Sequence, residues 1–550
     1  MPSGARWAAA VRSEAQAAAP AESAWVPFRS RVFVIIWTAT LLGNVGTWIR
    51  DVGAGWLMTT LSSSATAVAM VQVATTLPIF LLSLPAGALA DIVDRRRLLL
   101  WTYALLTGVS LSLALLTQAG RMTPTLLLLG LLVGGVGFAL VTPVLQSLTP
   151  LLVARPQLRA AVALNSMGIN VARAIGPALG GVLLATVGVA ATFAADALSY
   201  LFVIAAFGWW KGASARASNA APEQLGPALR AGLRFAWHAP ALQRTLLRSG
   251  SFFVFASAYW ALLPLIARQQ LGGGPAYYGI LLACVGAGAV AGAVGLPTLR
   301  RKLSAEGTMR LGLLLSIGVL LVLATTRDQV AAAVVMTLAG AAWIAVLTIA
   351  NVTAQTQLPN WVRGRGLAIY LTVFYGAMTL GSFVWGQVAD RSSVPTALLA
   401  AAGVGVLALA IAWLRPLPDD EPDLTPSLHW PEPALSAPMT ASLDGDRGPV
   451  LVTIEYRIER TQSAAFLTAL RAFAPERCRD GAYQWGVFAD SSEPGRFVES
   501  FLLPSWREHQ RQHHRVSQAD AALQQRVHGF HRGVQPPRVQ HFIAPPEKAP

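Results

Sequence analysis

Charged side chains are scarce in this chain of 550 residues: Asp, Glu, Lys and Arg make up 13% of it, against 54% hydrophobic residues. A soluble domain usually carries about 25% charged residues, so most of this chain is unsuited to water. Cysteine is limited to Cys284 and Cys478, which excludes a disulfide framework and a four-cysteine zinc site. No G-x-x-x-x-G-K-[ST] loop occurs, which argues against ATP as the energy source.

Acidic residues are especially rare in residues 1–415, which hold 10 of the 27 Asp and Glu but 28 of the 42 Lys and Arg. Residues 416–550 hold the other 17 acids and 14 bases, so the formal charges are 28 − 10 = +18 and 14 − 17 = −3. The bases come in short groups between apolar stretches and never form a polybasic run. This pattern argues against nucleic acid as a partner and is typical of membrane topology signals.

Long apolar stretches are what the first part does contain. A membrane-spanning helix needs about 20 predominantly apolar residues, and twelve such helices are predicted. They are expected near 31–60, 65–90, 97–118, 123–148, 160–186, 190–210, 249–268, 277–298, 308–326, 330–355, 364–388 and 394–414. Lys and Arg gather in alternate connections, which stay cytoplasmic. The sequence therefore predicts a multi-pass protein of the bacterial inner membrane with both termini cytoplasmic and no cleaved signal peptide.

The predicted fold is an all-α membrane protein with twelve transmembrane helices in two six-helix halves, plus a small C-terminal α+β ferredoxin-like domain. The expected segments are a cytoplasmic arm at 1–27, the halves at 28–210 and 248–415, a cytoplasmic central loop at 211–247, a Pro-rich linker at 416–448 and the soluble domain at 449–545. Helical spacing of Leu225, Leu229, Leu233 and Trp237 indicates either an amphipathic helix at the membrane interface or a linker helix packed on the halves. Two halves around a midplane site are typical of secondary transporters.

A loop motif stands between the second and third predicted helices, at Gly87-Ala88-Leu89-Ala90-Asp91-Ile92-Val93-Asp94-Arg95-Arg96-Arg97. It resembles the loop motif of the major facilitator superfamily, with Ile92 in place of a basic residue and Asp94 in place of a glycine. The resemblance implies that Gly87, Asp91, Arg95 and Arg96 form a conformational latch, which breaks as the halves rock. Simple cytoplasmic anchoring by the arginines is the alternative.

A second motif lies in the fifth predicted helix, where Arg173 precedes Gly176-Pro177-Ala178-Leu179-Gly180-Gly181. It looks like the G-P-x-x-G-G core found in the exporting, antiporter branch of that superfamily, although the upstream glycines of the longer motif are absent. Proline bends a helix and glycine allows close helix packing. The resemblance implies export, with this helix as a hinge that limits proton leak, and ordinary small-residue packing is the alternative.

The first predicted helix carries an N-x-G-x-W pattern from Asn44 to Trp48, followed by Trp56-Leu57. This pattern resembles the branch that contains the enterobactin exporter and transmembrane secretion effectors, and the resemblance extends over roughly residues 28–415.

Two acids, Asp51 and Asp196, lie inside predicted spans, where ionisable residues are costly and usually functional. Asp51 is the preferred proton-coupling candidate, and Asp196 is the second. Neighbours at i,i+1 do not share a helix face, so Arg50 and Asp51 are not expected to face the same cavity. The alternatives are that Asp51 lies at the outer interface of a shorter helix, and that Asp196 forms a structural pair with Arg173.

Aromatic and amide residues inside the spans are candidates for a cargo cavity, because they suit amphiphilic, partly aromatic molecules. Interface belts and helix–helix contacts are the alternative for each. The candidates are Asn44, Trp48, Trp56, Gln72, Gln146, Asn170, Tyr259, Trp260, Asn351, Gln355, Tyr370 and Tyr375.

The soluble tail alternates apolar and polar residues from Val450 to Ile458, as a half-buried strand does. A helix near 462–474, strands near 482–489 and 496–503, one helix near 505–531 and a strand near 537–543 complete a β-α-β-β-α-β order. The tail resembles the dimeric α/β-barrel domains of the antibiotic-biosynthesis monooxygenase type, which implies a regulatory or dimerising module. A catalytic or metal-binding role would depend on His509, His513 and His514, but no third ligand or zincin glutamate is evident.

Together these observations predict a proton-coupled exporter that moves a small amphiphilic molecule, such as a siderophore, drug or secondary metabolite, by alternating access. Its partners would be the small molecule, protons and the lipid bilayer, with a homodimer through the soluble domain as a further expectation. No cofactor, metal or enzymatic activity is expected. An importer of the same fold, or a membrane-anchored monooxygenase-like protein, are the alternatives.

Overall fold

The computed structural model describes residues 25–210, 225–418, 421–427 and 447–545. Among them, twelve helices are long and apolar enough to span a membrane, which confirms the predicted fold class. The first six are α2 (Arg31–Leu61), α3 (Ala65–Ile92), α4 (Arg95–Gln118), α5 (Pro124–Leu152), α6 (Leu158–Thr186) and α7 (Val189–Trp209). The second six are α9 (Pro240–Leu265), α10 (Pro275–Lys302), α11 (Ala305–Thr325), α12 (Gln329–Thr356), α13 (Arg363–Arg391) and α14 (Val394–Leu414).

Several of the spanning helices begin at polar residues whose side chains bond the free amides of the first turn. Asp94 accepts a hydrogen bond from the Arg97 amide at 2.8 Å, so it caps α4 at the position where the superfamily motif has glycine. Asp328 caps α12 in the same way, accepting from the Ala331 amide at 2.6 Å. One boundary was predicted wrongly: α9 begins at Pro240 rather than near 249, because the helix starts before the apolar stretch does.

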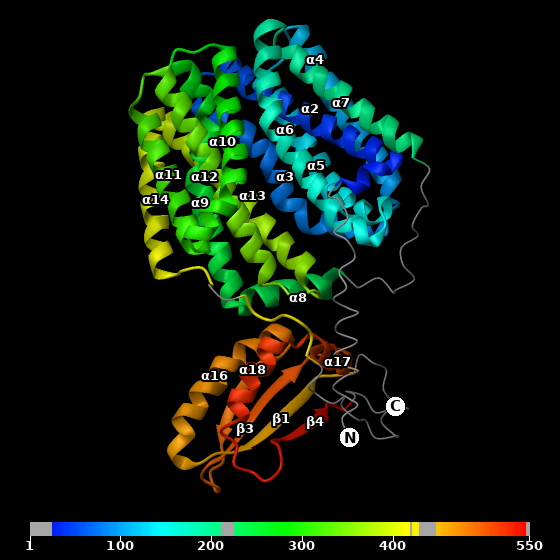
Figure 1. The fold of residues 1–550 in the computed structure, drawn as a ribbon, viewed down its shortest axis with the longest axis vertical. Helices are drawn as coiled ribbons and strands as arrows, with labels where there is room; N and C mark the ends of the chain where they lie inside the picture. The colour runs from blue at the N-terminus through cyan, green and yellow to red at the C-terminus, as the bar shows by residue number, and fades with distance from the viewer. Residues whose placement is uncertain (1–24, 211–224, 419–420, 428–446, 546–550) are drawn as a thin grey trace.

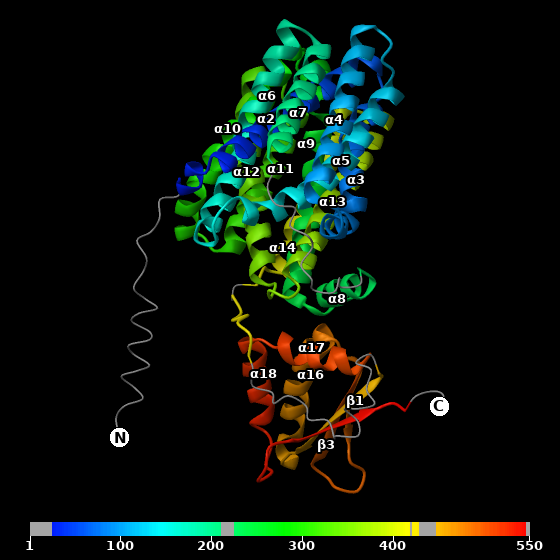
Figure 2. The ribbon, with the colours of Figure 1, turned by 90° about the vertical axis from the view of Figure 1, so that its right-hand side faces the viewer.

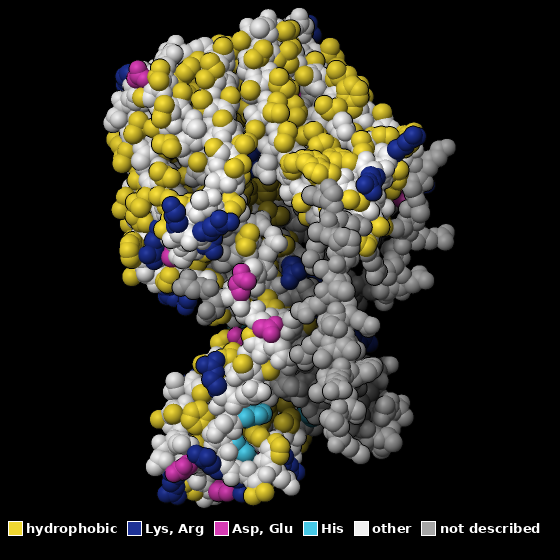
Figure 3. All heavy atoms as spheres, in the orientation of Figure 1, with side chains coloured by type: hydrophobic (Ala, Val, Ile, Leu, Met, Phe, Trp, Pro, Cys, Tyr) yellow, Lys and Arg dark blue, Asp and Glu magenta, His cyan; other side chains and the backbone are white. Residues whose placement is uncertain are grey.

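The two halves stand side by side, with the soluble domain below one end of them (Figure 1). We name that end of the membrane part proximal and the opposite end distal. On the face in Figure 3, hydrophobic side chains cover most of the membrane part, and Lys and Arg lie mainly toward the proximal end. The surface between the halves is hollowed in the same view.

The halves are closed against each other at the distal end. Asp390, at the end of α13, accepts hydrogen bonds from the Ala65 amide at 2.9 Å and from Ser64 Oγ at 3.0 Å, where α3 begins. Arg268 donates to Thr59 Oγ1 at 3.1 Å and lies over the Trp56 ring at the end of α2. These contacts join residues of opposite halves.

Helix α8 (Leu225–His238) connects the halves and lies across the proximal end (Figures 1 and 2). Its buried face includes Phe235, whose ring meets the Trp361 ring edge-on at 5.7 Å, whereas Leu233 and Trp237 are exposed. One face of α8 therefore packs on the second half, as the linker alternative predicts, and the other face exposes apolar side chains. A position at the membrane interface stays a prediction.

The soluble domain has a four-stranded antiparallel sheet in the order β2-β3-β1-β4. The helices lie on one side of this sheet (Figure 2). The elements are β1 (Val450–Arg457), α16 (Ser463–Asp480), β2 (Tyr483–Ala489), β3 (Arg496–Leu503), α17 (Trp506–Arg515), α18 (Gln518–His528) and β4 (Arg538–Ile543). The α+β prediction is confirmed, but the single helix predicted near 505–531 is wrong. Ser517 and Asp520 form a capping box that starts α18 as a separate helix.

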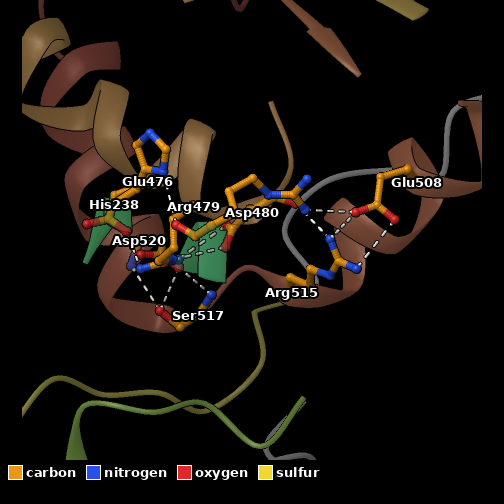
Figure 4. A network of polar contacts seen from close by, with 9 residues as sticks. His238, Glu476, Arg479, Asp480, Glu508, Arg515, Ser517 and Asp520 are labelled. Carbon is orange, nitrogen blue, oxygen red and sulfur yellow. Dashed lines mark hydrogen bonds and ion pairs between the residues drawn. The ribbon is translucent and has the colours of Figure 1, made fainter. Parts of the chain in front are cut away.

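The soluble domain contacts α8 and the connection between α12 and α13 through charged side chains. Glu508 of α17 pairs with Arg234 of α8 at 3.0 Å and with Arg515 at 2.6 Å. The Arg515 guanidinium lies 4.5 Å from the centre of the Trp361 ring. Figure 4 shows Glu508 beside Arg515, and next to them the network of Arg479 with Asp480 and Asp520. Burial alone would raise the pKa of Glu508, but Arg515 and Arg234 outweigh burial and hold the pKa below its ordinary value.

We expect Arg234→Glu to separate the soluble domain from α8, because it places two carboxylates where an ion pair now stands. A hydrogen bond between charged groups contributes about 1.5–3 kcal/mol, so amide exchange in α8 is expected to accelerate about tenfold or more. The double variant Arg234→Glu/Glu508→Arg should restore slow exchange. Arg230→Glu, which changes an exposed residue of the same helix, is the control. Equal exchange in all variants would show that the pair does not hold the domain.

Candidate functional site

A cavity of about 290 Å³ lies between the two halves, near the middle of the spans. Five of the residues predicted to line a cargo cavity do line it, namely Asn44, Trp48, Gln72, Trp260 and Tyr375. Its charged lining consists of Arg50, Asp51 and Arg173. Sequence reasoning missed Trp343 and Phe374, which complete an aromatic wall from the second half.

A second cavity of about 440 Å³ lies beside the first one, inside the N-terminal half. The two share Asn44 and Phe138 in their lining, and the second reaches Phe33 and Leu152 at the proximal ends of α2 and α5. Gln146 lines this second cavity, as predicted. The second cavity therefore extends from beside the central cavity toward the proximal end of the N-terminal half.

Arg50 organises a buried group of charges on the wall of the central cavity. Its Nη2 lies 2.8 Å from Asp51 Oδ1, and its Nη1 lies 3.6 Å from Asp196 Oδ2. Asp196 is fully buried and accepts a hydrogen bond from Ser110 Oγ at 2.6 Å, while its Oδ1 has no hydrogen-bond partner among the described residues. Tyr200 lies 3.5 Å from Arg50 Nη1. The group thus connects α2, α4 and α7.

One expectation about these charges was wrong, and one alternative is not what the structure shows. Arg50 and Asp51 both line the cavity, because the long arginine side chain bends back to reach its neighbour. Asp196 pairs with Arg50 and not with Arg173, whose guanidinium lies 6.0 Å from the centre of the Trp48 ring. The four-residue spacing of Asp196 and Tyr200 on one face of α7 was a signal that could have pointed to this buried group.

The glycines of the fifth span pack α6 closely on two neighbours. A Cβ on Gly176 would lie 2.5 Å from Trp48 Cβ, and one on Gly180 would lie 3.1 Å from Ile49 Cα, both on α2. A Cβ on Gly181 would lie 2.5 Å from Gly279 Cα on α10, in the opposite half. Pro177 is buried within the same helix. Gly181 therefore belongs to the distal closure.

Several predicted residues lie outside both cavities. Tyr259 and Tyr370 are buried in the helix packing of the second half, and Trp56 stacks on Tyr278 at the distal end. Asn351 accepts a hydrogen bond from Gln355 along α12. Asn170 is exposed and donates to the Ser166 carbonyl. Residue type alone cannot tell which face of a helix is turned to the cavity.

Of the predicted latch, Gly87 and the side chain of Asp91 lie outside what the structure describes. Arg96 donates to the carbonyls of Phe207 and Gly208, each at 2.8 Å, at the end of α7. Arg95 follows directly on the Asp94 cap. Latching therefore stays a prediction.

The histidines of α17 do not form a metal site in the part of the chain described. His509 is buried with its ring 4.8 Å from that of His513 and 4.7 Å from that of His541, whereas His514 is exposed. Burial, then the neighbouring His513 and His541, lower the pKa of His509 to about 3. No group of three metal-ligating side chains occurs among the described residues.

A family profile described as transmembrane secretion effector matches residues 22–549, which includes the soluble domain. The chain belongs to the transmembrane secretion effector family. It is a multi-pass membrane transporter of the major facilitator type.

Relatives of this secretion effector are transporters. It is 26% identical over 429 residues to the multidrug efflux pump Tap of Mycobacterium tuberculosis (strain ATCC 25618 / H37Rv), covering 74% of this chain and 99% of that protein. It is 33% identical over 168 residues to the staphyloferrin A transporter of Staphylococcus aureus (strain NCTC 8325 / PS 47), covering 30% and 42%.

Solved structures agree in fold. A bacterial homolog of the human lysosomal transporter Spinster, inward-facing and unoccupied, has a TM-score of 0.56 at 15% identity over 71% of this secretion effector and 97% of that chain. An auto-inhibited POT family peptide transporter has a TM-score of 0.57 at 14% identity, over 70% and 96%.

Proposed function

We propose that the protein exports a small amphiphilic molecule against protons, by alternating access, from the bacterial inner membrane with both termini cytoplasmic. The observation that carries the proposal is the charged group of Arg50, Asp51 and Asp196, in which Arg50 and Asp51 line the cavity between the halves and Asp196 is buried behind them. Ionisable groups at this depth are costly and mark ion or substrate pathways.

Protonation of one carboxylate in this group changes which carboxylate Arg50 interacts with. Arg50 interacts with two carboxylates, of which Asp51 is half-buried and faces the cavity and Asp196 is fully buried. When a proton neutralises either carboxylate, the attraction of Arg50 to that carboxylate weakens, and Arg50 turns toward the other one. Because the carboxylates stand on α2 and α7, protonation alters the contact between two helices of the same half. Asp51 exchanges protons with the cavity that it faces, and the buried Asp196 holds its negative charge beside Arg50.

Export is favoured over import by the exporter-type sequence around Gly176–Gly181 and by the similarity to a multidrug efflux pump. The latch of Gly87, Asp91, Arg95 and Arg96 would favour one conformation at the proximal end. An importer of the same fold is the alternative. Membership of the enterobactin-exporter branch, a monooxygenase-like origin of the soluble domain, and homodimerisation through it stay predictions.

Dye accumulation in efflux-deficient cells, together with uptake into inside-out vesicles, tests the direction and the coupling. We expect cells expressing the protein to hold less of a fluorescent amphiphile than vector controls, and a protonophore to abolish the difference. Acidifying the interior of inside-out vesicles should drive dye uptake. Dye leaving such vesicles under the same gradient would instead support the importer, and efflux insensitive to protonophore would contradict proton coupling.

A further inference from the structure

Arg173 is a cationic residue of the central cavity whose charge the other charged residues of the cavity do not neutralise. Arg50 pairs with Asp51 and lies 3.6 Å from Asp196. Arg173 lines the same cavity, and no ion pair joins it to a carboxylate within the described ranges. Its position is midway along α6, thirteen residues before the end at Thr186. At about 1.5 Å per residue, that is about 20 Å, so its side chain cannot reach the membrane surface from there.

A guanidinium held at this depth is costly unless an anion joins it. An aromatic ring lies near it instead: the centre of the Trp48 ring is 6.0 Å from Arg173 Cζ, and the Trp48 ring is 6.5 Å from the ring of Trp260 in the opposite half. Tyr375 also lines this part of the cavity. An aromatic or apolar body therefore fits between the two halves, and an anionic group fits at Arg173.

We propose that Arg173 is the anion-binding residue of the cargo site, and that the cargo class is an amphiphile bearing a carboxylate or sulfonate next to an aromatic or apolar body. This inference rests on the proposed export function. The planar guanidinium presents paired donors that match a carboxylate in two parallel hydrogen bonds. The anion of the cargo supplies the charge that the cavity lacks, so binding removes the cost of the unpaired cation.

In this arrangement, cargo and protons are bound by different residues. The proton group is built on Arg50 with residues of α2 and α7, whereas Arg173 belongs to α6 and faces Trp48. Trp48 is two residues before Arg50 on α2, so the two sites meet at one helix. Neutralising Arg173 is therefore expected to change which cargo binds, with proton coupling retained for cargo that still binds.

Two xanthene dyes of similar shape and opposite charge test the proposal, fluorescein as the anion and rhodamine 123 as the cation. Binding to the purified full-length protein is measured by fluorescence anisotropy. We expect wild type to bind fluorescein more tightly than rhodamine 123, and Arg173→Gln to weaken fluorescein binding by about tenfold or more while rhodamine 123 binding is unchanged or stronger. Arg173→Lys should keep part of the fluorescein affinity. Arg121→Gln, an exposed arginine outside both cavities, is the matched control.

Equal fluorescein binding by wild type and Arg173→Gln, or no fluorescein binding by wild type, would overturn the anion site. Measuring efflux of the same dyes from cells distinguishes a failure of the anion site from a failure of the proposed export function. Fluorescein that binds through Arg173 but is not exported would contradict export and leave the anion site standing. Export of fluorescein that Arg173→Gln does not alter would leave export standing and remove the anion site.

Discussion

Asp196→Asn is expected to abolish protonophore-sensitive efflux while the protein remains folded in the membrane. The amide has the shape of the carboxylic acid and still accepts the hydrogen bond from Ser110, so the packing of α4 against α7 is kept. What is lost is the charge 3.6 Å from Arg50. Removing one partner of a buried ion pair costs about 3–5 kcal/mol, which shifts a two-state equilibrium by more than about a hundredfold. The variant thus imitates the protonated state permanently.

Asp51→Asn is expected to have the same sign and a smaller effect, because Asp51 is half-buried and Arg50 keeps Asp196. Asp328→Asn is the control: it also removes one carboxylate, but from an exposed helix cap, where asparagine caps equally well. All variants are compared at equal membrane levels, with and without protonophore. Wild-type efflux by Asp196→Asn that a protonophore still abolishes would move proton coupling to another residue.

The sequence was sufficient for the twelve spans and for the α+β tail, because hydropathy and alternation depend on local composition. It was not sufficient for the charge group. The rule that neighbouring residues share no helix face describes Cβ directions, and the arginine side chain is long enough to cross from one face to the next, as Arg50 does to reach Asp51. The pairing of Arg50 with Asp196 requires the register of α2 against α7, which no local pattern encodes.

The residues that line the cavity could not be identified from the sequence either. Trp48 and Tyr259 are aromatic residues in the middle of spans, yet Trp48 lines the cavity and Tyr259 is fully buried among Trp260 and Trp343. The difference lies in how each helix is rotated against its neighbours. The close packing of Gly176, Gly180 and Gly181 agrees with what their sequence pattern predicts, because glycine in a spanning helix lets neighbouring helices approach closely.

Gly181→Val is expected to stop transport by holding the distal end open. A Cβ at this position would lie 2.5 Å from Gly279 Cα, closer than a side chain can approach, and the obstacle is backbone. Valine adds two methyl groups to that conflict, so α6 and α10 must separate. Overpacking costs about 1–3 kcal/mol, which is enough to reverse an equilibrium between two conformations of similar energy. We expect efflux to fall about tenfold or more, with Gly279→Val acting alike.

Thiol labelling of the cavity distinguishes a distal end that is held open from simple misfolding. A cysteine in place of Gln72, which lines the central cavity, is expected to resist a membrane-impermeant thiol reagent applied from the distal side, and to react when Gly181→Val is added. Gly403→Val, which meets open space in α14, should change neither labelling nor efflux. If Gly181→Val lost efflux and the cysteine stayed protected, the glycine would be needed for folding and not for the distal closure. Labelling gained together with efflux lost would show that the backbone contact of Gly181 and Gly279 closes the distal end in each transport cycle.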